Sequence, residues 1–241
     1  MSNYLNNHGS ETKTSNLKLS FHKRAKKFEL LFSEYLPKDY SSKIIDIGCS
    51  TGQIVGWLQH IGYEKASGVD SDSESISFGI KAGIKNLYQN DIFEHLGKIK
   101  SESVDLFILR DITEHLVKKD FERILCLLEE KLTVNGFIWI QTPNAISPAS
   151  HFMMYGDWTH ETLVSPTSLR QLVSHASSLE IEKLKGEHVV KIGFRKLHLK
   201  IIRSIINSIY KLYFSTLTSL NYGEIIIEPN LITVLKKKKL K

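Results

Sequence analysis

Residues 44–53 read IIDIGCSTGQ, an apolar run followed by a turn that contains Gly48 and Gly52. The run has the β-branched content of a buried strand, and apolar residues recur at helical spacing in residues 53–61. Glycine lets such a turn bend sharply and approach a ligand closely, because it has no β-carbon. The segment therefore predicts a strand, a glycine-containing loop and a helix, which together begin an α/β domain.

The same alternation continues toward the C-terminus. Strand-like runs are separated by helix-like stretches, which predicts βαβ units and a parallel sheet. We expect Asn135-Gly136 to end the helix that precedes the strand at 137–143, and Ser165 to cap the helix that follows the long loop. Further strands are predicted at 66–70, 86–91, 104–109, 180–185 and 229–235, helices at 17–36, 73–83, 118–132 and 165–179, and a long loop at 145–164.

Length and composition indicate one domain with appendages. The 241 residues can bury a full core, and 41% apolar with 24% charged residues excludes a disordered or fibrous chain. We divide the chain into a lid and leading helix (1–42), an α/β core (43–185), a basic amphipathic helical insertion (186–228) and a last strand with a basic tail (229–241).

The compartment follows from cysteine usage and the N-terminus. Cys49 and Cys126 lie far apart and lack metal-ligand spacing, which favours a reducing compartment. Residues 1–16 are polar and have no apolar core, so we expect neither a signal peptide nor a membrane anchor. The prediction is a cytoplasmic protein that touches the inner membrane, if at all, peripherally.

Polar residues at predicted strand ends suit a nucleoside cofactor. Asp70 ends the second strand, where its carboxylate can accept both hydrogen bonds of a ribose diol. A dinucleotide fingerprint needs further glycines, but Ser50 and Gln53 stand at those positions, which disfavours a pyrophosphate. S-adenosylmethionine has no phosphate, and its ammonium group suits Asp46, while Asp91 can accept from the adenine amino group.

Four segments in order, IIDIGCSTG, GVDSDS, NDIFEHL and VDLFILRDITEHL, resemble the motifs of class I S-adenosylmethionine-dependent methyltransferases across about residues 43–185. The resemblance implies a Rossmann-like α/β fold, a seven-stranded mostly parallel sheet with helices on both faces and, here, a helical insertion before the last strand. It implies S-adenosyl-L-methionine as cofactor and S-adenosyl-L-homocysteine as product. The cofactor residues implied are Asp46, Gly48, Cys49, Gly52 and Gln53 around methionine, Asp70 and Ser71 at the ribose, Asp91 and Ile92 at adenine, and Arg110 beneath the methyl donor. Ser50 departs from the pattern, since a third glycine is common there.

Methyl transfer to a hydroxyl needs alignment of two reactants and removal of one proton. We expect the catalytic residues to be Asp111 and His115, which follow the fourth strand, and His160 in the long loop. His115 resembles a histidine that orders the site in small-molecule methyltransferases. The segment DWTHETLVSPTSL around His160 resembles DxTHxxxxSPxxL in methyltransferases of polysaccharide-modification clusters. Other acidic residues nearby are Glu114, Asp157 and Glu161.

Two further interpretations concern metal and pocket lining. Asp111, Glu114 and His115 offer metal donors as in quinone-ring methyltransferases that resemble this chain, but the same turn occurs in metal-independent relatives. We therefore expect no required metal. The apolar side chains of the long loop are expected either to line the acceptor pocket or to anchor the loop, namely Met153, Met154, Tyr155 and Trp158.

The function expected is O-methylation of a small anionic or glycosylated acceptor in bacterial capsule or O-antigen biosynthesis. The acceptor atom is a sugar hydroxyl or a phosphoryl or phosphoramidate oxygen of a nucleotide- or lipid-linked intermediate. Three alternatives stay open: a quinone-ring O-methyltransferase, a nucleic-acid methyltransferase, and a catalytically silent cofactor-binding protein. The pI of 9.1 motivates the nucleic-acid reading. Residues 110–113, RDIT, lack its Asn/Asp-Pro-Pro-aromatic motif, so we expect no nucleic-acid partner.

The net charge of +6 is concentrated late in the chain. Residues 193–220 combine isoleucines at helical spacing with a basic polar side, as in helices that lie on anionic membranes. Such a helix serves equally as a packed lid or as a dimer face, and we favour packing over membrane contact. The oligomeric state is left open.

Overall fold

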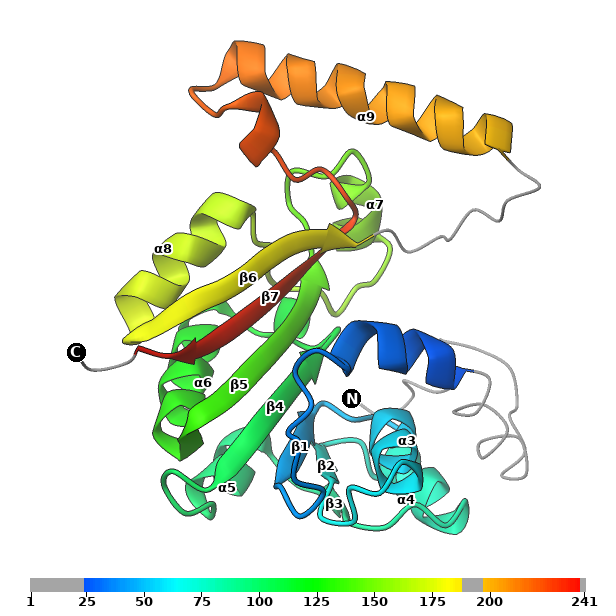
Figure 1. The fold of residues 1–241 in the computed structure, drawn as a ribbon, viewed down its shortest axis with the longest axis vertical. Helices are drawn as coiled ribbons and strands as arrows, with labels where there is room; N and C mark the ends of the chain where they lie inside the picture. Colours follow the sequence, from blue (N-terminus) through cyan, green and yellow to red (C-terminus); the bar gives the residue numbers. More distant parts are fainter. Residues whose placement is uncertain (1–23, 188–196, 239–241) are drawn as a thin grey trace.

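The computed structural model describes residues 24–187 and 197–238. A seven-stranded sheet has the order β3-β2-β1-β4-β5-β7-β6 (Figure 1). The first five strands are parallel, and β7 runs antiparallel between β5 and β6. This confirms the predicted mostly parallel sheet. The strands are β1 (Ile44–Ile47), β2 (Ser67–Asp70), β3 (Leu87–Gln89), β4 (Val104–Arg110), β5 (Leu132–Pro143), β6 (Leu179–Glu187) and β7 (Asn230–Lys237).

Helices cover both faces of the sheet, because successive strand residues point to opposite sides. Leu106 and Ile108 of β4 pack into a cluster with the helix at residues 24–32, while Phe107 and Leu109 pack into the other cluster. The first cluster also includes α3 (Gln53–His60) and α4 (Ser73–Lys81), and the second includes α5 (Ile92–Gly97), α6 (Lys118–Lys131) and α8 (Pro166–Ala176).

The main differences from the predicted elements concern the junction of α6 and β5, the long loop and the end of β6. Strand β5 begins at Leu132, five residues before the predicted start, so Asn135-Gly136 lies within the strand and α6 ends earlier, at Lys131. The pairing with β4 jumps from Leu132 to Phe137, and this irregularity accommodates the turn-forming pair. The predicted loop at 145–164 contains α7 (Ser150–Tyr155). Strand β6 continues to Glu187, two residues past the predicted end of the core.

At the N-terminus, the helical part of the leading segment is seen at 24–32, and the predicted lid lies outside the described residues. Ser165 caps α8 as expected, in a capping box with Ser168.

The predicted insertion contains one long helix, α9 (Leu197–Leu217), none of whose residues is buried. Its contacts are chiefly with the short helix η3 (Tyr222–Glu224), and Figure 1 shows it standing apart from the sheet. The expectation of a helix packed as a lid is therefore wrong for the described chain, because the helix turns its apolar side to solvent. Within the described ranges, no helix combines the length and hydropathy needed to cross a bilayer.

Candidate functional site

The glycine loop after β1 adopts the strained backbone that its sequence predicts. Gly48, Ser50 and Gly52 have φ of 71°, 48° and 73°, in the left-handed region. A β-carbon on Gly48 would lie 2.7 Å from the side chain of Ile112, so glycine is required there for space as well as for conformation. Gly52 then caps α3, whose first residue is Gln53. The loop brings the end of β1 against the segment after β4.

The acidic residues of the predicted cofactor site lie at the ends of adjacent strands. Asp70 accepts hydrogen bonds from the backbone N–H of Ser50 at 2.7 Å and of Asp72 at 2.9 Å. A carboxylate has about four lone-pair sites, so acceptor capacity remains for a diol. Asp46 is buried, and its burial raises the pKa to about 8, against an opposing effect of Arg110. Asp46 and Arg110 thus flank the point where the chain order in the sheet reverses, between β1 and β4.

Asp91 has a structural role as a helix cap. It is the N-cap of α5, and its Oδ1 accepts from the backbone N–H of Phe93 at 2.8 Å and of Glu94 at 3.1 Å. Both bonds use one oxygen, which leaves Oδ2 for another partner. Ile92 begins that helix, and Ser71 is exposed directly after β2. Cys49 is buried, and burial raises the pKa of its thiol, so it packs as a neutral side chain.

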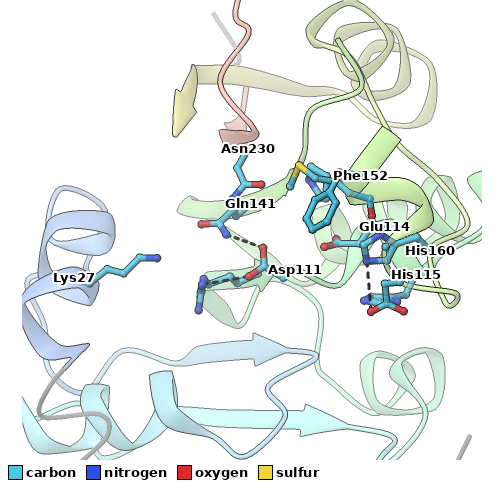
Figure 2. Close-up of a pocket in the computed structure, with 13 residues that line it drawn as sticks. Lys27, Asp111, Glu114, His115, Gln141, Phe152, His160 and Asn230 are labelled. Atoms are coloured by element: carbon cyan, nitrogen blue, oxygen red, sulfur yellow. Dashed lines mark hydrogen bonds and ion pairs between the residues drawn. The ribbon is translucent and has the colours of Figure 1, made fainter. Parts of the chain in front are cut away.

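A pocket of about 360 Å³ lies at the carboxyl ends of β4 and β5. Figure 2 shows side chains from the segment after β4, from the α7 loop and from the start of β7 converging on it. All three predicted catalytic residues, Asp111, His115 and His160, line this pocket, as does Arg110 from the predicted cofactor set. The other lining residues are Lys27, Glu114, Gln141, Pro143, Phe152, Met153, Gly156, Asp157 and Asn230.

Four buried polar atoms of the pocket lining make no hydrogen bond within the described chain. They are Arg110 Nε, Glu114 Oε2, Gln141 Oε1 and Asn230 Oδ1. Buried polar groups are nearly always paired in native proteins, so several orphans around one cavity indicate that a polar ligand completes them. Three of the four are acceptors, which calls for a ligand rich in hydroxyl or other donor groups.

Backbone bonds hold the long loop against the segment after β4. The N–H groups of Glu161 and Thr162 donate to the carbonyl oxygen of Glu114 at 2.8 and 3.0 Å. These bonds bring His160 beside His115, with ring centroids 4.8 Å apart in an edge-to-face arrangement. The sequence placed the two histidines 45 positions apart, and only this loop contact joins them.

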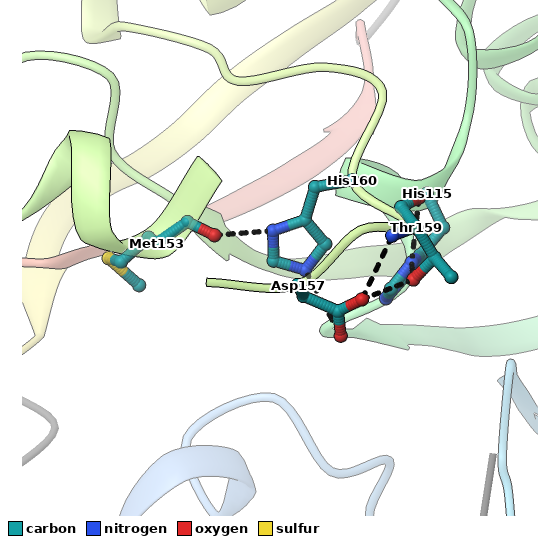
Figure 3. A network of polar contacts seen from close by, with 5 residues as sticks. All are labelled: His115, Met153, Asp157, Thr159 and His160. Carbon is teal, nitrogen blue, oxygen red and sulfur yellow. Dashed lines mark hydrogen bonds and ion pairs between the residues drawn. The ribbon is translucent and has the colours of Figure 1, made fainter. Parts of the chain in front are cut away.

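Hydrogen bonds orient both imidazole rings (Figure 3). His160 Nδ1 lies 2.6 Å from the carbonyl oxygen of Met153, which can only accept, so Nδ1 carries the proton. His115 Nδ1 lies 2.9 Å from Thr159 Oγ1, whose own proton goes to Asp157 Oδ1 at 2.7 Å. His115 therefore also donates through Nδ1. Because Nδ1 donates in both rings, Nε2 is the ring nitrogen that faces a further partner, and in His160 it lies 4.0 Å from Asp157 Oδ2.

The pKa values of the groups in the pocket are shifted in opposite directions. Burial, with the nearby Asp111 carboxylate, raises the pKa of Glu114 to about 8. Burial and the neighbouring His160 lower the pKa of His115. Burial opposes ionisation of Asp157, but hydrogen bonds from Thr159, together with the electrostatic attraction of His160 and His115, outweigh it and lower its pKa to about 2. The pocket therefore combines a His115 imidazole whose pKa is lowered with carboxyl groups of widely separated acidity.

Asp111 lies at the centre of the pocket wall. Its φ of 55° is unusual for a residue with a side chain, and its carboxylate accepts from Gln141 Nε2 at 2.6 Å and pairs with Arg110 at 3.2 Å. Non-glycine residues held in this region often belong to functional sites, where surrounding contacts maintain the strain.

Sequence reasoning missed Lys27, Gln141 and Asn230 as lining residues. No motif marks them, because each comes from a different element and enters the site only through strand order. Of the loop side chains expected to line the pocket, Met153 does so, whereas Tyr155 and Trp158 are largely exposed. Phe152 of α7 also lines the pocket, at its edge, because its side chain is 80% exposed (Figure 2).

The sequence matches the family described as "Methionine biosynthesis protein MetW" over residues 30–149. Among curated proteins, none matches this chain significantly.

Solved structures match nearly the whole chain. A SAM-dependent methyltransferase from Archaeoglobus fulgidus is 22% identical and covers 92% of this chain and 94% of its own, with a TM-score of 0.63. The putative methyltransferase in complex with the Trm112 activator from Haloferax volcanii is 13% identical, with coverage of 94% and 95% and a TM-score of 0.64. Geranyl diphosphate C-methyltransferase from Streptomyces coelicolor, solved with Mg²⁺, geranyl diphosphate and S-adenosyl-L-homocysteine, is 10% identical, with coverage of 98% and 88% and a TM-score of 0.60. With its strand order, these similarities show that the chain has the Rossmann-like fold of class I S-adenosylmethionine-dependent methyltransferases.

Proposed function

We propose that the protein is an S-adenosylmethionine-dependent O-methyltransferase whose acceptor is a small, polar, anionic molecule. The observation that carries this proposal is the set of four buried polar atoms without partners around the pocket of about 360 Å³. A protein that kept the fold only as a scaffold has no need of such a cavity, because each unpaired buried group costs about 1–3 kcal/mol.

The chain's residues fit the cofactor. Asp46 provides a buried carboxyl for the ammonium group, and Asp70 retains acceptor capacity for the ribose diol. The left-handed glycine loop keeps the backbone clear between them. Bound there, S-adenosylmethionine supplies a methyl group activated by the sulfonium. Arg110 lies both in this region and in the pocket lining, so the two sites adjoin.

The pocket chemistry supports a sugar or phosphoryl acceptor. The unpaired oxygens of Glu114, Gln141 and Asn230 suit hydroxyl or amide donors, while Lys27 and Arg110 suit an anionic group. We therefore propose a sugar hydroxyl or a phosphoryl or phosphoramidate oxygen of a nucleotide- or lipid-linked intermediate in surface-polysaccharide biosynthesis. The geranyl diphosphate C-methyltransferase was crystallised with a ligand that contains a diphosphate group. This is compatible with an anionic acceptor here. A quinone ring would leave most of these polar groups unsatisfied.

A hydroxyl acceptor must lose its proton as its oxygen attacks the methyl carbon and the carbon–sulfur bond breaks, with the electron pair passing to sulfur, whereas an anionic phosphoryl oxygen attacks without proton transfer. Asp111, His115 and His160 all line the pocket within reach of such a hydroxyl. A carboxylate or an imidazole of this set can therefore receive the proton.

Calorimetric titration with S-adenosylhomocysteine tests the cofactor site, with NAD as a control ligand. We expect micromolar binding of the first alone. Asp70→Ala should weaken that binding by roughly 1–3 kcal/mol, because ribose hydrogen bonds are lost. The matched control is Asp39→Ala, since Asp39 bonds only within a surface turn with Ser41. Unchanged affinity in Asp70→Ala would refute the ribose assignment, and no binding by the wild type would refute the proposed function.

We also propose that α9 holds the protein against an anionic bilayer on the cytoplasmic side. One side of the helix is apolar and exposed, through residues such as Ile201, Ile205 and Ile209. The more shielded side carries Lys200 and Lys211, and residues 197–217 contain no acidic residue. A helix is about 10 Å thick. The cations on its more shielded side would therefore lie about one Debye length from anionic headgroups that contact its apolar side. This arrangement supports the proposal of a lipid surface over that of a protein groove, and membrane contact of this kind would bring the protein close to lipid-linked acceptors.

A further inference from the structure

We propose that Glu114, His115 and His160 form a binding site for one divalent transition-metal ion within the acceptor pocket. One donor atom from each of these residues lies within 4.8 Å of a donor atom of the others. The ligands come from the short helix η1 (Thr113–His115) and from the loop after α7, and backbone bonds between Glu114 and residues 161 and 162 hold these segments together.

The hydrogen bonds behind the histidines prepare both rings for a cation. Metal-binding histidines usually donate their other ring N–H to a carbonyl, carboxylate or similar acceptor, which fixes the tautomer. His160 donates Nδ1–H to the Met153 carbonyl, and His115 donates Nδ1–H to Thr159. Asp157 in turn fixes Thr159. With Nδ1 of each ring engaged behind the site, Nε2 of each ring is the nitrogen available as a metal ligand.

Glu114 provides the independent observation. The residue is 3% exposed, it lines the pocket, and its Oε2 makes no hydrogen bond within the described part of the chain. No group of the described chain bonds to this oxygen, and a cation that displaces the carboxyl proton can bind it together with the two imidazoles. A cation satisfies all of them at once, and Figure 2 shows the three side chains grouped at one end of the pocket.

Ligand type and spacing indicate the kind of metal. Two imidazoles with one carboxylate suit Zn²⁺, Fe²⁺ or Mn²⁺ better than Ca²⁺. Metal–ligand bonds of about 2.0–2.2 Å place donor atoms roughly 3–3.5 Å apart, so the site would close by about 1.5 Å on loading. Three protein ligands leave coordination positions open for the acceptor.

This inference rests on the proposed function in one respect, the presence of the acceptor in this pocket. A metal ion held there would make a bound acceptor hydroxyl easier to deprotonate, and the Asp111 carboxylate, which lines the same pocket outside the ligand set, would be the group to receive that proton. The sequence led us to expect no required metal, because the same turn occurs in metal-independent relatives. The folded loop adds His160 to the Glu114-His115 pair.

The test is titration of the chelator-treated full chain, without a polyhistidine tag, with Co²⁺ and with Zn²⁺. We expect one ion per chain and visible Co²⁺ absorption typical of nitrogen and oxygen ligands. Affinity should fall at least about tenfold in His160→Ala and in Glu114→Gln, since each removes one ligand. His175→Ala is the matched control, because His175 is an exposed histidine of α8 outside the cluster.

The isosteric Glu114→Gln variant, which keeps the volume of the buried side chain, separates ligand loss from misfolding. Its S-adenosylhomocysteine affinity should equal that of the wild type. Absence of Co²⁺ and Zn²⁺ binding, or equal binding by all variants, would overturn the metal site. Metal binding without S-adenosylhomocysteine binding would instead remove the proposed function and leave the metal site standing.

Discussion

At the scale of single residues, the pocket contains features that destabilise the fold, namely a strained backbone position and buried polar atoms without partners. Asp111 sits in left-handed backbone, and Glu114, Gln141 and Asn230 each bury an oxygen without a partner. Folding alone would favour apolar replacements at such positions, because unpaired buried groups are destabilising. Their grouping around one cavity is the residue-level argument for a ligand.

Gly48→Ala tests the glycine loop. The alanine would hold φ of 71° and would place its β-carbon 2.7 Å from Ile112, so we expect the free energy of unfolding to fall by about 1–3 kcal/mol. Gly97→Ala is the control, because Gly97 ends α5 with open space around it and should be neutral or slightly stabilised. Urea unfolding measures both. Equal stability of the two variants would contradict the requirement for glycine at residue 48.

Asp46 makes stability depend on pH. Burial raises its pKa from 3.8 to about 8, so the folded state holds this proton more tightly than the unfolded state. Stability is then highest below the unfolded pKa and is lost as pH rises toward about 8. We expect Asp46→Asn to lose less free energy of unfolding than the wild type between about pH 5 and about pH 8. Parallel pH profiles for the two proteins would contradict the raised pKa.

At the scale of elements, α8 shows how local sequence supports the site. Ser165 and Ser168 form a capping box that starts the helix directly after the histidine-bearing loop. Leu169 and Val173 of this helix are buried against the sheet. The cap thus fixes where the loop ends, and the isolated bridge between Asn144 and Val164 closes the loop at its base.

Ser165→Ala removes the cap of α8. We expect a loss of about 1 kcal/mol of stability, because the N–H of Ser168 loses its acceptor. Ser174→Ala is the control, since the Ser174 hydroxyl bonds to the Gln171 carbonyl on the exposed side of the same helix. Thermal unfolding of the two variants decides the question, and identical midpoints would show that the capping box contributes nothing.

At the scale of the whole molecule, the carboxyl edge of the sheet brings the cofactor loops and the acceptor pocket together, while α9 stands outside the packed domain (Figure 1). Glu187 and Asn230 pair in the sheet at the two ends of the insertion. The excursion that contains α9 can therefore serve a separate contact without altering the sheet.

The membrane proposal predicts that the full chain sediments with vesicles containing phosphatidylglycerol and much less with phosphatidylcholine vesicles. The double variant Ile205→Asp with Ile209→Asp should lose this binding, because it places charge on the apolar side. Ser204→Asp with Ser208→Asp adds equal charge on another side of α9 and should retain more binding. If the isoleucine variant instead converts a dimer to a monomer in sedimentation equilibrium without changing vesicle binding, α9 is an interface between copies.

The sequence alone determined the α/β class, the sharp glycine-containing turn after the first strand, the carboxyl groups at the strand ends and the cap of α8. These features depend on contacts between near neighbours, so spacing and residue type suffice to predict them. Only the tertiary structure decided that β7 lies between β5 and β6, that Lys27, Gln141 and Asn230 line one pocket, that His160 meets His115, and that α9 is exposed. Those outcomes depend on strand pairing and burial between residues far apart in the chain, which local patterns do not encode.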